Sequence, residues 1–236
     1  YSAQDAAADG IDCLEHIESV LYFSIPAGTG FALESNAQLD LRNPKCQSLI
    51  ALLAKKKVAV DPTITVFRNM LYLSDLKEYY EHPDVAHCPQ RMRDYWTRFR
   101  IAHKLDPATQ RVRRRLIAKY LELTALLHRL GVTLLVGTDA PEPFVPPGFS
   151  LHQELEMYVE AGISPVDALK AATMNNAAIL GQEKNLGSIE PGKLADLVIL
   201  NADPTNEIKN TREIYRVVRS GIVCNPAEVL KAVPRN

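Results

Sequence analysis

The stretch GVTLLVGTDAP, residues 131–141, decides the fold class of this chain. Residues 132–136 form an apolar run of strand length, and the run leads directly into Gly137-Thr138-Asp139-Ala140. A run of this kind is typical of a strand that is buried in a parallel sheet. An aspartate at the end of such a strand is costly to bury without a role, so Asp139 is a candidate functional residue. Its alternative role is to cap a helix or loop.

The residues before this strand predict a helix, and the same order occurs earlier in the chain. Asp106-Pro107 supplies a capping residue and a proline at the first helical position, the apolar positions over 112–130 keep helical spacing, and Gly131 ends the helix. Earlier, a helix over 44–57 is followed by a short apolar strand over 58–60. Repeated helix-to-strand units predict an α/β fold.

A further strand is predicted over residues 11–14, after a short helix that Ser2 caps and Gly10 ends. This strand leads to His16. Imidazole and carboxylate groups are both good ligands for zinc and similar divalent ions. A single histidine at a strand end is more often a hydrogen-bonded structural residue, so position alone does not make His16 a ligand.

Beyond Asp139 the pattern changes from helical to β-rich. One helix is predicted over 151–162, and another starts at the capping box Ser164-Pro165-Val166-Asp167 and continues to Gly181. Three strand candidates follow, over 195–200, 215–218 and 222–224. We therefore expect a larger α/β region over 1–184 and a small β-rich segment over 185–236.

Residues 63–105 mix aromatic and polar side chains without sustained periodicity, and we interpret them as a long insertion over one end of the domain. Tyr95, Trp96 and Phe99 either line a substrate pocket or hold this insertion in place. The next helix carries several arginines, which in a neutral protein indicate a solvent-exposed face: Arg111, Arg113, Arg114 and Arg115.

The composition argues against several classes of protein. Of the 236 residues, 47% are hydrophobic and 23% are charged, as in ordinary globular proteins. The formal net charge of -1 disfavours nucleic-acid binding, and no apolar run is long enough to cross a membrane, so we expect a soluble protein. The 4 cysteines are far apart, which predicts neither a zinc site nor a disulfide framework. The chain starts at Tyr1 without a signal-peptide pattern, as if inside a fold, so no compartment is predicted.

Four strings of the sequence resemble the amidohydrolase superfamily. GVTLLVGTDAP resembles the eighth barrel strand of these enzymes, and GIDCLEH (10–16) resembles the sixth. The strings LHQELEMYVEAGISPVDALKAATMNNAAILG (151–181) and LGSIEPGKLADLVILNADP (186–204) are similar to the segment that closes the barrel and enters a small β-sandwich domain. The likeness is closest to imidazolonepropionase-like and Xaa-Pro dipeptidase-like hydrolases. It implies the C-terminal part, about strands 6 to 8, of a TIM (β/α)8 barrel, followed by part of a composite sandwich domain.

The resemblance also implies roles for individual residues. His16 would be a metal ligand, and Asp139 would be both a metal ligand and the general base that takes a proton from the attacking water. The cofactor would be a divalent metal, with zinc as the expected ion. His152, on the helix after the last barrel strand, would contact the substrate; its alternative role is a surface residue facing Glu156 one helical turn on.

Most of the family's metal shell has no counterpart in this chain. The 6 histidines include no H-x-H pair, and the lysine or glutamate that bridges two metals in the family is also not found. We expect the C-terminal portion of a metal-dependent hydrolase that acts on carbon–nitrogen bonds of small amide-type or cyclic amide substrates. The alternatives are a truncated or degenerate barrel half without activity, and a half that is completed by the missing N-terminal half or by an oligomeric partner.

Overall fold

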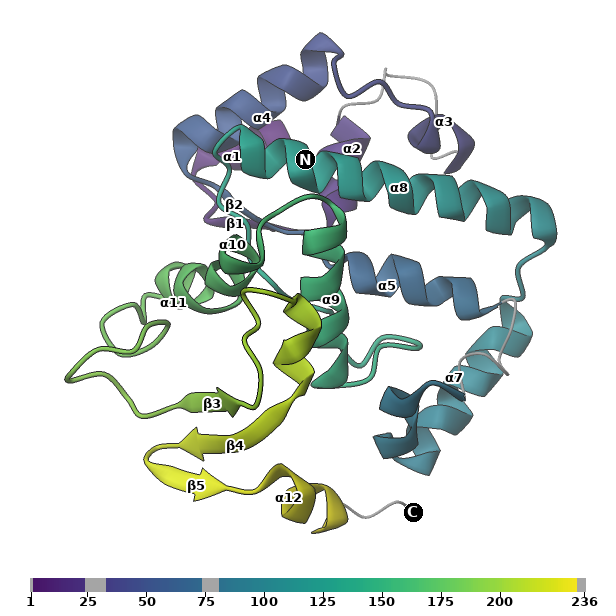
Figure 1. Ribbon diagram of the computed structural model, residues 1–236. Helices are drawn as coiled ribbons and strands as arrows, with labels where there is room; N and C mark the ends of the chain where they lie inside the picture. Colours follow the sequence, from purple (N-terminus) through teal and green to yellow (C-terminus); the bar gives the residue numbers. More distant parts are fainter. Residues whose placement is uncertain (1, 24–32, 74–80, 233–236) are drawn as a thin grey trace.

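The computed structural model describes residues 2–23, 33–73 and 81–232, and this part of the chain is mixed α/β and mostly helical (Figure 1). The helical elements are, in chain order, α1 (Ala3–Asp9), α2 (Ile17–Phe23), α3 (Leu33–Ala37), α4 (Pro44–Lys56), α5 (Ile64–Asn69), η1 (Met70–Leu73), η2 (Pro83–His87), α7 (Gln90–Ala102), α8 (Pro107–Arg129), α9 (Phe149–Glu160), α10 (Pro165–Lys170), η3 (Ala171–Asn175), α11 (Asn176–Ile179), η4 (Ile208–Arg212) and α12 (Pro226–Ala232). The strands are β1 (Cys13–Glu15), β2 (Ala59–Asp61), β3 (Leu197–Leu200), β4 (Ile214–Arg219) and β5 (Ile222–Cys224).

Three segments that follow helices lie side by side and run in parallel. β1 pairs with β2 in register from Cys13 opposite Ala59. On the other side of β2, Val60 forms a parallel bridge with Leu134, and its amide donates to the Thr133 carbonyl at 2.9 Å. The helix-to-strand order predicted from the sequence is therefore confirmed, and the carboxyl ends of all three segments point the same way.

The strand predicted over 132–136 is wrong in extent, because only a single bridge forms there. Side chains pair with several of the other backbone groups of this run. Asn175 and Asn176 donate amide hydrogens to its carbonyls at 2.9 and 3.0 Å, and the Tyr158 hydroxyl donates to the Leu135 carbonyl. These bonds satisfy buried backbone groups that a neighbouring strand would otherwise pair.

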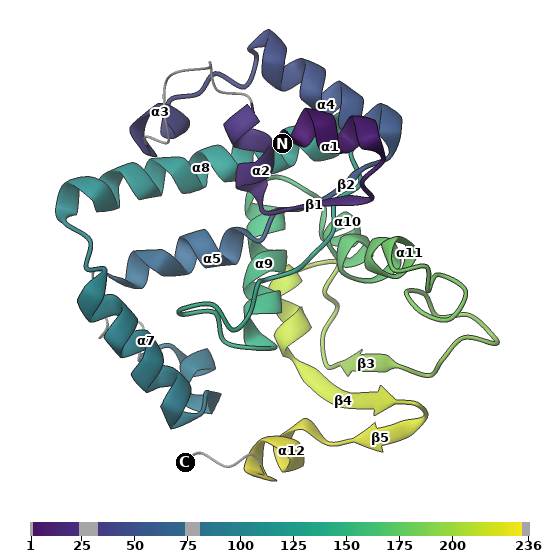
Figure 2. The same ribbon diagram turned by 180° about the vertical axis from the view of Figure 1, so that it is seen from behind.

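The main hydrophobic core lies between the parallel segments and the helices that cover them. α8 is the longest contributor, and it packs against α2, α3, α5 and α9. Its buried side chains recur at helical spacing, as predicted: Leu116, Ile117, Tyr120, Leu123, Thr124, Leu126 and Leu127. In both views α1 and α4 lie at one end of the molecule and β3, β4 and β5 lie at the other (Figures 1 and 2).

The insertion predicted over 63–105 is more regular than expected, since it contains α5, two short 3-10 helices and α7. Its residues 74–80 lie outside the described residues. The sequence does not predict α7, because Trp96 is its single buried residue and the helix therefore has no apolar stripe. Trp96 packs in a small second cluster with Val85, Cys88 and Phe144, so it holds the insertion in place.

The C-terminal segment contains one antiparallel sheet in the order β3-β4-β5, and the three predicted strands are confirmed. None of the residues of these three strands is buried. The structure describes a single sheet layer here, with no second sheet facing it within residues 185–232. No helix in the described part of the chain has both the length and the apolar character of a membrane span.

Candidate functional site

Two of the expected functional side chains meet at the carboxyl ends of the parallel segments. His16 directly follows β1, and Asp139 follows the run that lies beside β2. The His16 Nε2 atom lies 4.0 Å from Asp139 Oδ2. The side chains are 43% and 42% exposed, so both remain accessible to a ligand from solvent.

Two further residues, Asp61 at the end of β2 and Thr63 just after it, hold His16 in place, and the sequence alone predicts no functional role for either. The His16 amide donates to the Asp61 carbonyl at 2.8 Å, and His16 Nδ1 lies 2.8 Å from the Thr63 hydroxyl. The signal that could have identified them is their position, because Asp61-Pro62-Thr63 follows β2 just as His16 follows β1.

The Asp61 carboxylate lies at the end of β2 and is partly buried. Burial raises the pKa of Asp61 to about 6, although hydrogen bonds from the backbone of Gly137 and Thr63 favour its ionised form. Its Oδ1 atom accepts from the Gly137 amide at 2.9 Å. Asp61 therefore ties the end of β2 to the segment that leads to Asp139.

The backbone is strained at all three strand ends. His16, Thr63 and Asp139 have φ angles of 64°, 46° and 55°, in the left-handed region that residues with a side chain rarely adopt. Such conformations persist where the surrounding structure enforces them, and they are concentrated at functional sites. Three of the six non-glycine residues with positive φ in the described part of the chain lie at these strand ends, which supports this edge as the candidate site.

The donor chemistry of this pair fits part of a divalent-metal site. An imidazole nitrogen and a carboxylate oxygen are normal zinc ligands, and 4.0 Å is close to the separation of about 3.3 Å between two ligands of one tetrahedral zinc. The bond between Nδ1 and Thr63 leaves Nε2 as the ring nitrogen that faces Asp139. Within residues 2–23, 33–73 and 81–232, no group of three or more His, Cys, Asp or Glu side chains could hold a metal.

His152 lies on the helix after Asp139 but faces the C-terminal segment. Its Nδ1 atom is 2.9 Å from the Thr211 hydroxyl. Burial lowers the pKa of His152 from its usual value, which favours the neutral ring. The ring lines an apolar cavity of about 360 Å³ between α9 and residues 186–200. Glu156, its expected neighbour, accepts a hydrogen bond from Arg212 Nε at 2.8 Å instead.

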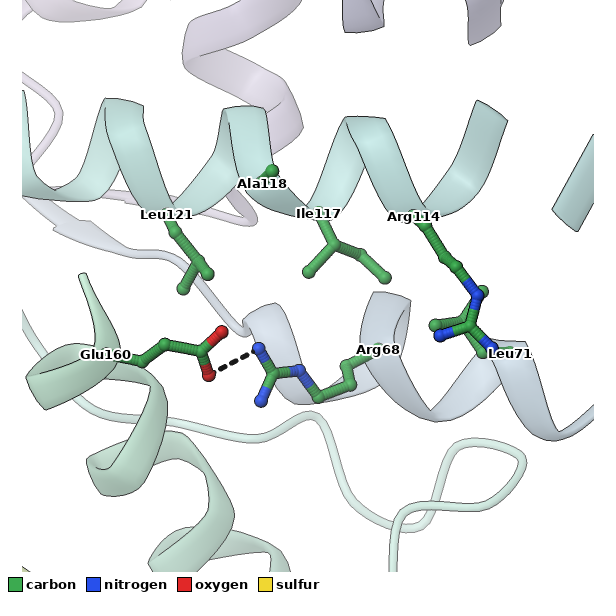
Figure 3. Close-up of a pocket in the computed structure, with 7 residues that line it drawn as sticks. All are labelled: Arg68, Leu71, Arg114, Ile117, Ala118, Leu121 and Glu160. Atoms are coloured by element: carbon green, nitrogen blue, oxygen red, sulfur yellow. Dashed lines mark hydrogen bonds and ion pairs between the residues drawn. The ribbon is translucent and has the colours of Figure 1, made fainter. Parts of the chain in front are cut away.

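A second hollow lies in the groove between α5, α8 and α9 and has a volume of about 410 Å³ (Figure 3). It is lined by Arg68, Leu71, Arg114, Ile117, Ala118, Leu121 and Glu160. Arg68 and Glu160 form an ion pair of 2.6 Å across it, which neutralises two of its charges. Neither His16, Asp139 nor His152 lines this groove, so it is separate from the strand ends.

Comparisons with known proteins agree on one family. The model of a family described as "Amidohydrolase family" matches residues 3–223. An imidazolonepropionase of Symbiobacterium thermophilum is 41% identical over 78 residues, which is 33% of this chain and 18% of that protein.

Two solved structures are similar in fold. A structure described as bottromycin amidohydrolase matches with a TM-score of 0.68 at 22% identity, covering 97% of this chain and 48% of that one. A Xaa-Pro dipeptidase with bound methionine matches with a TM-score of 0.60 at 21% identity, covering 94% of this chain and 42% of that one. The chain thus spans less than half the length of these relatives.

Proposed function

Because this chain belongs to the amidohydrolase family, we propose that it is the C-terminal portion of a metal-dependent hydrolase that acts on carbon–nitrogen bonds of amide or cyclic amide type. One observation carries the proposal. His16 Nε2 and Asp139 Oδ2 lie 4.0 Å apart at the carboxyl ends of neighbouring parallel segments. Barrel enzymes build their active sites at this end of the strands.

In this proposal β1, β2 and residues 133–135 correspond to the sixth, seventh and eighth strands of a TIM barrel. Their parallel order supports the assignment, as does a chain length that covers 42–48% of the similar structures. The barrel portion extends over 1–184, and residues 185–236 contribute part of a sandwich domain. The exposed strands β3, β4 and β5 support the second assignment, because a sandwich needs another sheet to cover them.

Each site residue has a distinct role in the proposed reaction. His16 and Asp139 would hold a divalent metal, with zinc favoured by the donor types. A metal held there would polarise the substrate carbonyl and lower the pKa of bound water to about 7. The Asp139 carboxylate takes the proton from the attacking water and passes it to the leaving nitrogen. A substrate contact for His152 has less support, because the cavity that its ring lines beside α9 includes neither His16 nor Asp139.

The incomplete donor set favours a metal site that is completed by residues outside this chain. A zinc site normally needs three or four protein ligands, and the described residues bring only two together. The remaining donors then come from a missing N-terminal half or from another chain. A degenerate half without activity is the third possibility. We expect the 236-residue chain alone to show no metal-dependent hydrolysis, and activity that appears on co-expression with the upstream coding sequence would identify the first case.

The proposal is tested in the full-length protein loaded with zinc, manganese or cobalt. N-acyl amino acids, dipeptides and cyclic amides are screened as substrates. Asp139→Asn should lower turnover by about 10²–10⁴-fold, because it removes the proton acceptor. His16→Gln should lower the metal content of the purified protein.

The fold offers a matched control for these variants. His128 Nε2 lies 3.7 Å from Asp167 Oδ2, and both side chains are as exposed as the pair at the strand ends. His128→Gln should change neither metal content nor turnover. Full metal-dependent activity in Asp139→Asn would refute the proposed function.

A further inference from the structure

A stripe of buried polar side chains runs along α9 toward the ends of the parallel segments. Ser150, Glu154 and Tyr158 are spaced by four residues, so they share one face of the helix. All three are fully buried. Ser150 donates to the Thr138 hydroxyl at 3.1 Å, and Tyr158 donates to the Leu135 carbonyl. The two outer residues of the stripe thus hold the segment that leads to Asp139.

Glu154, the middle residue of the stripe, bonds to the other side of the candidate site. Its Oε1 atom accepts from the Ile64 amide at 2.9 Å, and its Oε2 atom accepts from the Thr65 amide at 2.7 Å and the Thr65 hydroxyl at 2.5 Å. These amides belong to the first turn of α5 and have no partner within the helix. A carboxylate from another helix therefore caps α5.

This arrangement changes what Thr63 can do. Thr63 occupies the N-cap position of α5, where a threonine hydroxyl normally accepts from an amide of the first turn. Here its side chain makes no capping bond, and its hydroxyl lies 2.8 Å from His16 Nδ1. The backbone of Thr63 is also strained, with φ 46° and ψ 43°, which is unusual for a β-branched residue.

We propose that Glu154 takes over the capping of α5 so that the Thr63 hydroxyl is free to fix the His16 ring, with Nε2 directed at Asp139. Glu154 and Thr63 are then positioning residues. The hydrogen bonds made by Asp61 and Glu154 on either side of Thr63 hold its backbone in the strained left-handed conformation. In this conformation the Thr63 hydroxyl reaches the His16 ring. Only the purpose of the positioning, metal binding by His16, rests on the proposed function.

The test separates positioning from structural support. Thr63→Gly removes the hydroxyl and also the side chain that makes the left-handed turn unfavourable. We expect the melting temperature of Thr63→Gly to be unchanged or higher, while the His16 ring loses its fixed state. Thr63→Ser keeps the hydroxyl, so the His16 ring should keep its fixed orientation and tautomer. Glu154→Gln should also release the His16 ring, because the weakened cap leaves the α5 amides open to the Thr63 hydroxyl. The hydroxyl would then bond to α5 in place of His16 Nδ1.

The ring is observed directly in full-length protein labelled with ¹⁵N-histidine, and His16→Gln assigns its signals. At a pH where the ring is neutral, a fixed ring gives widely separated shifts for its protonated and unprotonated nitrogens. The two shifts should converge in Thr63→Gly, because both tautomers become populated. In the same variant the affinity for zinc should fall by about 10–100-fold, as for other residues that orient a metal ligand.

The outcomes are distinguishable. Unchanged His16 shifts in Thr63→Gly would overturn the positioning role and leave the proposed function intact. Converging shifts in a protein whose parent form binds no divalent metal would support the positioning role and refute the proposed function. If Glu154→Gln does not fold, the comparison of Thr63→Gly with Thr63→Ser decides the matter alone.

Discussion

The Asp61 carboxylate is seated directly against Gly137. Its Oδ1 atom accepts from the Gly137 amide at 2.9 Å, and a Cβ atom at this glycine would come within 2.0 Å of Oδ2. Gly137→Ala should therefore displace Asp61 and lower the free energy of unfolding by about 1–3 kcal/mol. Urea denaturation measures the change. In an Asp61→Gly background the same substitution should cost less, and an equal cost would show that the clash lies elsewhere.

Glu154 should make stability depend on pH in a defined direction. Burial raises its pKa from 4.5 to about 7, against the effect of its three hydrogen bonds. The folded state then holds a proton that the unfolded state releases, so the stabilisation is complete below pH 4.5 and is lost as pH rises through about 7. Relative to Glu154→Gln, the free energy of unfolding should fall by roughly 3 kcal/mol over this window. A difference that grows with pH would mean that the carboxylate is ionised in the folded protein.

The ion pair between Arg212 and Asp84 should be a strong link between the C-terminal segment and the insertion. Arg212 Nη1 lies 3.0 and 3.1 Å from the two oxygens of Asp84, which is nearly buried, and Nε donates to Glu156. Arg212→Met should destabilise the protein by about 2–3 kcal/mol in urea denaturation, because it leaves a buried carboxylate without its charged partner. Arg68→Met, which breaks the more exposed pair with Glu160, should cost at most about 1 kcal/mol.

The 236-residue chain on its own should aggregate or bind hydrophobic dyes through the sheet β3-β4-β5. Ile222 and Val223 are exposed on β5, an edge strand. The double change Ile222→Thr and Val223→Thr keeps strand propensity and should reduce both dye fluorescence and oligomers in gel filtration. Ile101, equally exposed on α7, provides the control, and Ile101→Thr should change neither readout. A soluble monomer with one sharp melt and no dye binding would instead mean that the domain is complete.

The order of elements could be predicted from the sequence because it depends on local signals. The N-cap Asp106, the periodic apolar face of α8 and the turn residues near the C-terminus all act within a few residues of the elements they define. Helix α7 could not be predicted, since a helix with one buried residue has no apolar stripe.

The candidate site could be predicted only in part, because only some of its residues carry a local signal in the sequence. His16 and Asp139 each lie within three residues of the end of a predicted strand, which marks them locally. Glu154 interacts with residues 89 and 90 positions away, and in sequence it looks like an ordinary polar position of an amphipathic helix. The role of Thr63 depends on a backbone conformation and on a bond across 47 positions, neither of which a pattern of residue types contains.

The separate cluster around Trp96 has a consequence for how the folded chain fluctuates. Phe144 belongs to this cluster and not to the main core, yet it lies on the loop that carries Asp139. A small cluster of this kind opens at lower free energy than a main core, as a cooperative unit of its own. In amide hydrogen exchange, residues 81–103 and 141–148 should therefore lose protection together, well before α8. The loop that carries Asp139 would then open together with residues 81–103 while the rest of the molecule stays folded.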